Sequence, residues 1–227
     1  MSQIDKHLAE FRNTQQPSRL VLYGTGGSGK TQLALHYCRH SSGTFSGVFW
    51  IDGTSTATIY GTFVTAAKEF ILGDLQSQDT EQAKAIVLRF IGCSDHPWLV
   101  VFDNCDDVFA YEIEDFLPKQ GRNFTIITSR DRATQSLGPM VSIGNLTIDE
   151  ALQLLFRKRF DEQNTQAIQK GRVVVERLGY LPLAIAQASA YIRGRNVLDL
   201  DIFLEKYDVE QRRISATIPI IWGYGRE

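Results

Sequence analysis

The segment YGTGGSGKTQLA, residues 23–34, restricts the fold of this chain more than any other. It places four glycines within six positions, directly after the apolar segment RLVLY and directly before a run of good helix formers. Glycine is costly to order, so a cluster of glycines marks backbone that must approach something closely. We therefore expect a buried strand that ends near Tyr23, a tight glycine loop, and a helix that begins near Lys30.

The spacing within this loop is typical of phosphate binding. Gly24, Gly29, Lys30 and Thr31 fit the pattern G-x-x-x-x-G-K-[ST] of the P-loop. Such a loop turns backbone N–H groups toward a polyphosphate, and the helix behind it adds the partial positive charge of its N-terminus. Lys30 would contact the β- and γ-phosphates, and the Thr31 hydroxyl would bind Mg²⁺. The predicted nucleotide contacts in the loop are Thr25, Gly26, Gly27, Ser28, Gly29, Lys30, Thr31 and Gln32.

The alternative is a glycine-rich turn in front of an ordinary helix. The apolar strand before the loop and the helix after it favour the P-loop.

Two further residues are predicted to act at the same site because each follows an apolar strand. Asp103 ends WLVVFD, and Arg130 ends TIITSR. Ligands of open α/β sheets bind beyond the carboxyl ends of the strands. Asp103 is therefore a candidate Mg²⁺ ligand together with Thr31. Arg130 could reach a γ-phosphate, or it could pair with Asp131 or Asp106. The candidate catalytic residues are Lys30, Asp103 and Arg130.

The remaining patterns predict an α/β domain followed by helices. Near-continuous apolar segments alternate with helical patterns in the first part of the chain, which is typical of a parallel sheet covered on both faces. From Thr147 onward every pattern is helical, beginning with a capping box of Thr147 and Glu150. We predict a nucleotide-binding α/β domain over residues 1–146 and a helical subdomain over 147–227. The predicted strands cover residues 19–24, 46–53, 97–104, 123–130 and 140–144.

Composition argues against several classes of protein. The chain has 227 residues, of which 43% are apolar and 22% charged, and its formal net charge of -2 does not favour binding to nucleic acid or an anionic membrane. The three cysteines form no C-x-x-C pair, which argues against a disulfide framework or a zinc site and fits a reducing compartment. The apolar runs are too short to cross a bilayer. We expect a cytoplasmic protein with no membrane or nucleic-acid partner.

Taken together, the motifs resemble the NB-ARC type of signal-transducing P-loop ATPase (STAND class), which is found in NOD-like receptors, and look most like its fungal members. The matching segments are LYGTGGSGKTQLA, VFWIDG, WLVVFDNCDD, TIITSRD and LGYLPLAIAQASAYI. The resemblance implies a five-stranded parallel sheet in which the TIITSR strand separates the strand before the loop from the strand that ends at Asp103. It also implies that Pro182, in the G-L-P-L-A element of the family, contacts the nucleotide from the helical subdomain, which is similar to the ARC1 subdomain.

The resemblance further implies ADP or ATP with Mg²⁺ as cofactors, and a role in innate immunity or programmed cell death. Implied partners are the other domains of a larger receptor and, depending on the nucleotide, further copies of the protein. The V-G-R element and the winged-helix segment of the family do not occur in this sequence. We therefore expect a form truncated at both ends relative to the family.

Hydrolysis is expected to be slow. Fast P-loop ATPases place a glutamate beside the magnesium aspartate to orient the attacking water, whereas this chain has Asn104, whose amide cannot accept a proton. Asp106 and Asp107 follow and could take that role. We predict a nucleotide-dependent switch with weak ATPase activity at most.

The sequence disfavours three other functions. A GTPase is disfavoured because no N-K-x-D motif follows Asp103. An assembly adaptor with a vestigial site is disfavoured by intact Lys30, Thr31 and Asp103. An ATP-dependent transcription regulator is disfavoured because no segment reads as a DNA-binding helix pair with a basic face.

Overall fold

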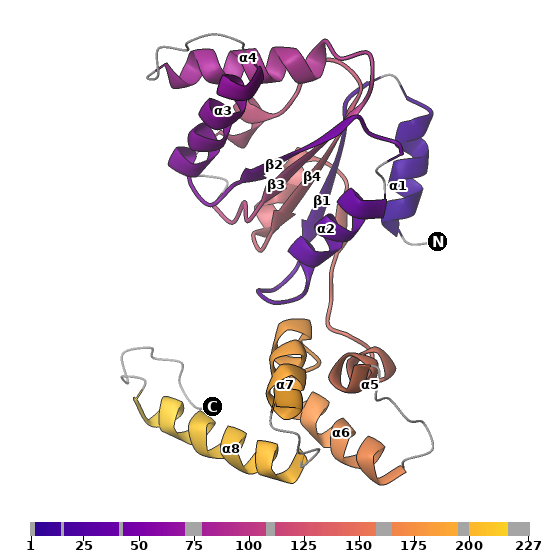
Figure 1. Cartoon of the computed structure of the whole chain (residues 1–227), viewed down its shortest axis with the longest axis vertical. Helices are drawn as coiled ribbons and strands as arrows, with labels where there is room; N and C mark the ends of the chain where they lie inside the picture. Colours follow the sequence, from indigo (N-terminus) through magenta and orange to yellow (C-terminus); the bar gives the residue numbers. More distant parts are fainter. Residues whose placement is uncertain are drawn as a thin grey trace. The chain divides into compact units, whose positions relative to one another are not determined.

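The computed structural model describes residues 3–14, 16–40, 43–70, 79–107, 112–157, 165–194 and 200–217. Its internal contacts divide the chain into two compact units, an α/β unit over Met1–Gly144 and a helical unit over Asn145–Glu227. Figure 1 shows both units.

The α/β unit is built on a sheet of five parallel strands in the order β2-β3-β4-β1-β5. This order confirms that the TIITSR strand separates the strand before the glycine loop from the strand that ends at Asp103. The strands are β1 (Ser18–Tyr23), β2 (Gly47–Asp52), β3 (Trp98–Asp103), β4 (Asn123–Ser129) and β5 (Met140–Ser142).

The strand register brings the functional segments to one edge of the sheet. Tyr23 at the end of β1 pairs with Ser129 at the end of β4, and Phe102 in β3 pairs with Ile127 in β4. Because the three strands are parallel and end nearly level, the loops that follow them lie side by side.

Helices cover both faces of this sheet, as the continuous apolar strands predicted. On one face lie α1 (Gln3–Arg12) and α2 (Lys30–His40). On the other face lie α3 (Thr56–Phe70), α4 (Thr80–Gly92) and the 3₁₀ helix η1 (Ile113–Phe116) (Figure 1).

A second 3₁₀ helix, η2 (Arg132–Leu137), was not predicted. Its sequence, RATQSL, has no apolar periodicity. It begins where the Asp131 carboxylate accepts a hydrogen bond of 2.9 Å from the Ala133 backbone N–H.

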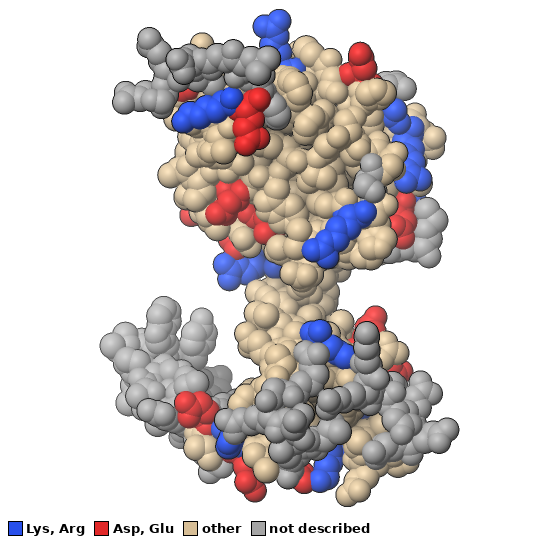
Figure 2. All heavy atoms as spheres, viewed as in Figure 1, with Lys and Arg blue, Asp and Glu red and all other residues tan. Residues whose placement is uncertain are grey.

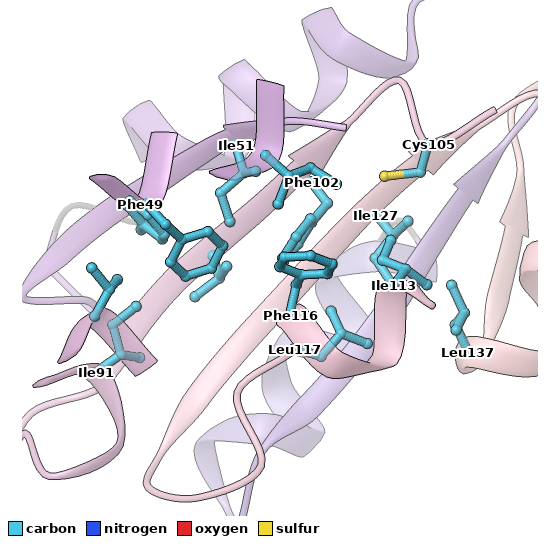
Figure 3. Packing of buried hydrophobic residues seen from close by; sticks show 14 of the residues in the cluster. Phe49, Ile51, Ile91, Phe102, Cys105, Ile113, Phe116, Leu117, Ile127 and Leu137 are labelled. Carbon is cyan, nitrogen blue, oxygen red and sulfur yellow. The ribbon is translucent and has the colours of Figure 1, made fainter. Parts of the chain in front are cut away.

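Alternate residues of the central strands point into two separate cores. Val100 and Phe102 of β3 pack with α3 and α4, whereas Leu99 and Val101 pack with α1 and α2. Figure 3 shows the first core, in which Phe49, Phe102 and Phe116 belong to one cluster of buried side chains. This double burial fixes the strand positions and therefore the edge at which the site is built.

The surface of the α/β unit carries both signs of charge. Figure 2 shows acidic and basic side chains interspersed with uncharged residues on the visible face of this unit, without a large patch of one sign. This mixture agrees with the formal net charge of -2.

The helical unit consists of α5 (Ile148–Phe156), α6 (Thr165–Arg177), α7 (Pro182–Gly194) and α8 (Leu200–Thr217). Thr147 and Glu150 form the predicted capping box at the start of α5. A core that includes Leu152, Val174 and Ile185 joins the helices. Within the described ranges, the helices are too short or too polar for any of them to span a bilayer.

Candidate phosphate-binding site

The glycine loop connects β1 to α2, and three of its glycines meet requirements that other residues would not. Gly27 and Gly29 have φ angles of 78° and 97°, in the left-handed region that favours glycine. A Cβ atom at Gly24 would lie 2.4 Å from the backbone oxygen of Ile143, which no side chain tolerates. The loop therefore requires glycine for its shape at three positions.

Lys30 is the first residue of α2, and its side chain folds back over the loop. Its Nζ donates hydrogen bonds of 2.8 Å to the Gly24 carbonyl and 3.0 Å to the Thr25 carbonyl. Only 8% of the residue is exposed. Burial lowers the pKa of Lys30 below its ordinary value of 10.5, and the negative charges of Asp106 and Asp103 partly oppose this effect. The cation is therefore held at the loop by carbonyl groups and nearby carboxylates.

The other predicted loop contacts differ in their exposure. Thr25, Gly26 and Gln32 are exposed, whereas Ser28 is buried. A Cβ atom at Gly29 would meet nothing within 4 Å, so the loop borders open space at the N-terminus of α2. Open space beside a buried cation and a helix N-terminus fits a phosphate group.

Thr31 and Asp103, the predicted magnesium ligands, lie together. The Thr31 hydroxyl donates to Asp103, with Oγ1 2.9 Å from Oδ1 and 3.2 Å from Oδ2. Asp103 ends β3 and is only 6% exposed. A hydroxyl and a carboxylate oxygen are ligands that suit Mg²⁺, which is usually bound by one or two protein oxygens plus phosphate and water. The donor set therefore fits this cation.

Thr128 is a member of the site that the sequence did not identify. It ends β4 with Ser129, and its residue is fully buried at 0% exposure. Its Oγ1 donates a hydrogen bond of 2.5 Å to Asp103 Oδ1 and accepts one of 3.0 Å from the Asn104 backbone N–H. The sequence signal for this role is a hydroxyl-bearing residue at the carboxyl end of an apolar strand. This signal is weak, because threonine is also common in strands that lie far from any site.

Arg130 pairs with Asp106, one of the two acids proposed as its partner from sequence. The Arg130 backbone N–H lies 2.7 Å from Asp106 Oδ1, and its Nε lies 2.6 Å from Oδ2. The same side chain borders the glycine loop, because its Nη1 would lie 3.5 Å from a Cβ atom at Gly26. Pairing with Asp106 therefore leaves Arg130 beside the phosphate loop.

Pro182 belongs to the helical unit, where it is the first residue of α7 and is partly buried. The turn before it has left-handed backbone at Gly179 and Tyr180, with φ angles of 60° and 56°. The Tyr180 carbonyl accepts a hydrogen bond of 3.0 Å from the Leu146 N–H. The contact between Pro182 and a nucleotide stays a prediction.

Known proteins resemble this chain in sequence and in fold. The family model described as NB-ARC domain matches residues 1–165. A fungal protein of Hyaloscypha variabilis named "Nucleotide-binding leucine-rich repeat (NLR)-like protein" is 23% identical over 226 residues, which cover 89% of this chain and 22% of that protein. Regulatory protein AfsR of Streptomyces griseus is 30% identical over 203 residues, which cover 85% of this chain and 20% of that protein. This chain thus spans about a fifth of the length of both relatives.

Among solved structures, Cdc6p from Pyrobaculum aerophilum has a similar fold. The TM-score is 0.60 at 15% sequence identity, with 87% of this chain and 62% of that chain covered. Since the family model covers well over half of its residues, and since the sheet order and the glycine loop have the form described above, the chain belongs to the NB-ARC family of nucleotide-binding P-loop NTPases.

Proposed function

We propose that this chain binds ADP and ATP with Mg²⁺ and acts as a slowly hydrolysing switch in a signalling protein of the NOD-like receptor type. The observation that carries the proposal is the 2.9 Å hydrogen bond between Thr31 and Asp103 at the end of the loop that holds Lys30. This bond places Lys30, which would bind phosphate, in the same site as two oxygen ligands that suit Mg²⁺. These two ligands, Thr31 and Asp103, are far apart in sequence.

Different residues of the site would contact different parts of the bound nucleotide. Lys30 would bind the β- and γ-phosphates in place of the carbonyls of Gly24 and Thr25, and the N–H groups of the loop would bind the phosphate oxygens. Thr31 and Asp103 would hold Mg²⁺, which neutralises phosphate charge when bound. Pro182 would contact the nucleotide from the helical unit.

Slow hydrolysis is supported by the residues that follow Asp103. Asn104 stands where a water-orienting glutamate would be needed, and its amide cannot accept a proton. Asp106 is the next acid, but both of its carboxylate oxygens already accept hydrogen bonds from Arg130. A site that keeps its nucleotide for long periods can use the γ-phosphate to shift the populations of two conformations. Arg130 would sense that phosphate.

The test is to purify the protein, denature it, and identify the released nucleotide by chromatography. Recovered ADP supports the switch. The melting temperature should rise with ADP or ATP in the parent protein and not in the Lys30→Ala variant. Lys119→Ala is the matched control, because Lys119 precedes β4 and therefore lies near the opposite edge of the sheet.

Three results would exclude this function. Turnover at or above about 1 per second, the low end for ordinary enzymes, would remove the slow switch. A strong preference for GTP in competition with labelled ATP would indicate a GTPase. No change in melting temperature with ADP or ATP would indicate an adaptor with a vestigial site.

A second candidate function is nucleotide-dependent regulation of transcription. It is supported by two Streptomyces relatives, 28% and 30% identical, that are named regulatory protein AfsR. Fluorescence anisotropy of a labelled DNA duplex, with and without ATP, tests it. Binding that depends on ATP would favour the regulator, and equal weak binding with and without ATP would exclude it.

A further inference from the structure

We propose that Asp106 is a positioning residue that aims Arg130 at the terminal phosphate and thereby sets the preference of the site for triphosphate over diphosphate. This inference rests on the proposed function. It assigns Asp106 a task other than that of a catalytic base, and it makes the Asp106–Arg130 pair part of the phosphate sensor.

Asp106 is well placed to act as an anchor because the backbone beside it is fixed. The preceding residue, Cys105, is fully buried, and its N–H donates a hydrogen bond of 2.9 Å to the Thr128 carbonyl. The Cys105 carbonyl in turn accepts a hydrogen bond of 2.5 Å from the Ser129 hydroxyl. These bonds tie the segment after β3 to the end of β4, the strand that Arg130 directly follows.

Arg130 needs such an anchor because 61% of its side chain is exposed. A free arginine side chain samples many rotamers, and ordering it on binding costs free energy. Asp106 accepts hydrogen bonds from both the backbone N–H and the Nε–H of Arg130. These two bonds fix the Arg130 side chain at its base and near its guanidinium group. Much of the ordering cost is therefore met before a nucleotide binds.

The form of the pair allows Arg130 to hold a phosphate at the same time. A guanidinium group has five N–H donors, and Asp106 takes only the one on Nε. The two terminal amino groups lie outside the pair, and Nη1 borders the loop at Gly26. Asp106 and a γ-phosphate would thus bind different sides of one guanidinium group, so Asp106 does not compete with the phosphate.

The test measures the dissociation constants of ADP and of a non-hydrolysable ATP analogue. Asp106→Asn should lower the preference for the triphosphate about five-fold, the upper range for an exposed charged pair, while changing the affinity for ADP little. Asp106→Ala should act in the same direction. Asp115→Asn is the matched control, because it also removes one carboxylate charge, and Asp115 pairs at 3.7 Å with Lys119 rather than with Arg130, so the ratio should stay unchanged.

A double variant identifies the route of the effect. In an Arg130→Gln background, Asp106→Asn should not change the ratio further, because the residue acts through Arg130. An unchanged or increased triphosphate preference in Asp106→Asn, or a full Asp106 effect without Arg130, would overturn the inference. If the parent protein binds neither ADP nor the ATP analogue, the proposed function itself is contradicted.

Discussion

The hydroxyl group of Thr128 lies 2.5 Å from the carboxylate of Asp103 and orients it from the neighbouring strand. Asp103 thus accepts one hydrogen bond from the loop side, through Thr31, and one from β4, through Thr128. When Thr31 binds a magnesium ion, Thr128 would remain as the donor that holds the carboxylate in place. The proposed magnesium site would therefore depend on a residue other than its two ligands.

We expect Thr128→Val to weaken the magnesium-dependent part of nucleotide binding about ten-fold, by analogy with the loss of residues that orient metal ligands. Valine keeps the shape of threonine but lacks the hydroxyl. Calorimetric titration of ADP with Mg²⁺ and with EDTA measures the effect, and Thr128→Ser should restore most of it. Thr125→Val, in the middle of the same strand, is the control. An equal effect of Mg²⁺ on Thr128→Val and on the parent protein would contradict this role.

The affinity for nucleotide should fall as the pH rises through the pKa of Lys30. Burial lowers this pKa in the free protein, whereas bound phosphate would favour the charged form and raise it. The complex then holds more protons than the free protein in this window, so affinity is constant below the lowered pKa and decreases above it. Titration calorimetry from about pH 7 to pH 10 should show this decrease together with proton uptake.

Lys30→Arg provides the comparison, because a guanidinium group stays charged over this range. Its affinity should be weaker but independent of pH. A decrease of the same size in Lys30→Arg would assign the pH dependence to another group.

Gly24→Ala should destabilise the loop and reduce nucleotide binding. The added methyl group would lie 2.4 Å from the Ile143 carbonyl oxygen, so the backbone must move. Overpacking of this kind typically costs about 1–3 kcal/mol of unfolding free energy. Gly144→Ala is the control, because a Cβ atom there would meet nothing within 4 Å. Denaturant unfolding and ADP titration measure both effects, and equal behaviour of the two variants would refute the steric explanation.

Thr147→Ala should destabilise the helical unit by about 1 kcal/mol through loss of the N-cap of α5. Hydrogen bonds from the Thr147 backbone and side chain lower the pKa of Glu150. Glu150 therefore stabilises the folded unit above the pKa it has when unfolded, and this contribution is lost as the pH falls through the lowered value. Hydrogen exchange of the α5 amides should be faster in Thr147→Ala at neutral pH, and the difference should shrink in acid. Unchanged exchange would exclude the capping contribution.

The features that sequence alone determined are those encoded in contiguous residues. The strand, glycine loop and helix around Lys30 follow one another within a short segment, and the capping box of Thr147 and Glu150 spans a single helical turn. Continuous apolar segments such as WLVVF likewise predicted a sheet buried on both faces. Local backbone preferences and periodicity are sufficient for such elements. The sequence did not predict the 3₁₀ helix η2, because RATQSL has no apolar periodicity and is too short to display one.

The tertiary structure decided which distant residues meet. Thr31 and Asp103 are 72 positions apart, and Arg130 is 24 positions from Asp106. The sequence did not determine whether Arg130 pairs with Asp131 or with Asp106, and it did not predict a role for Thr128. These pairings arise because β4 lies between β1 and β3 and the three strands end nearly level. Strand order depends on the packing of the whole sheet between its two helical layers, and this non-local free energy is not encoded in any single segment.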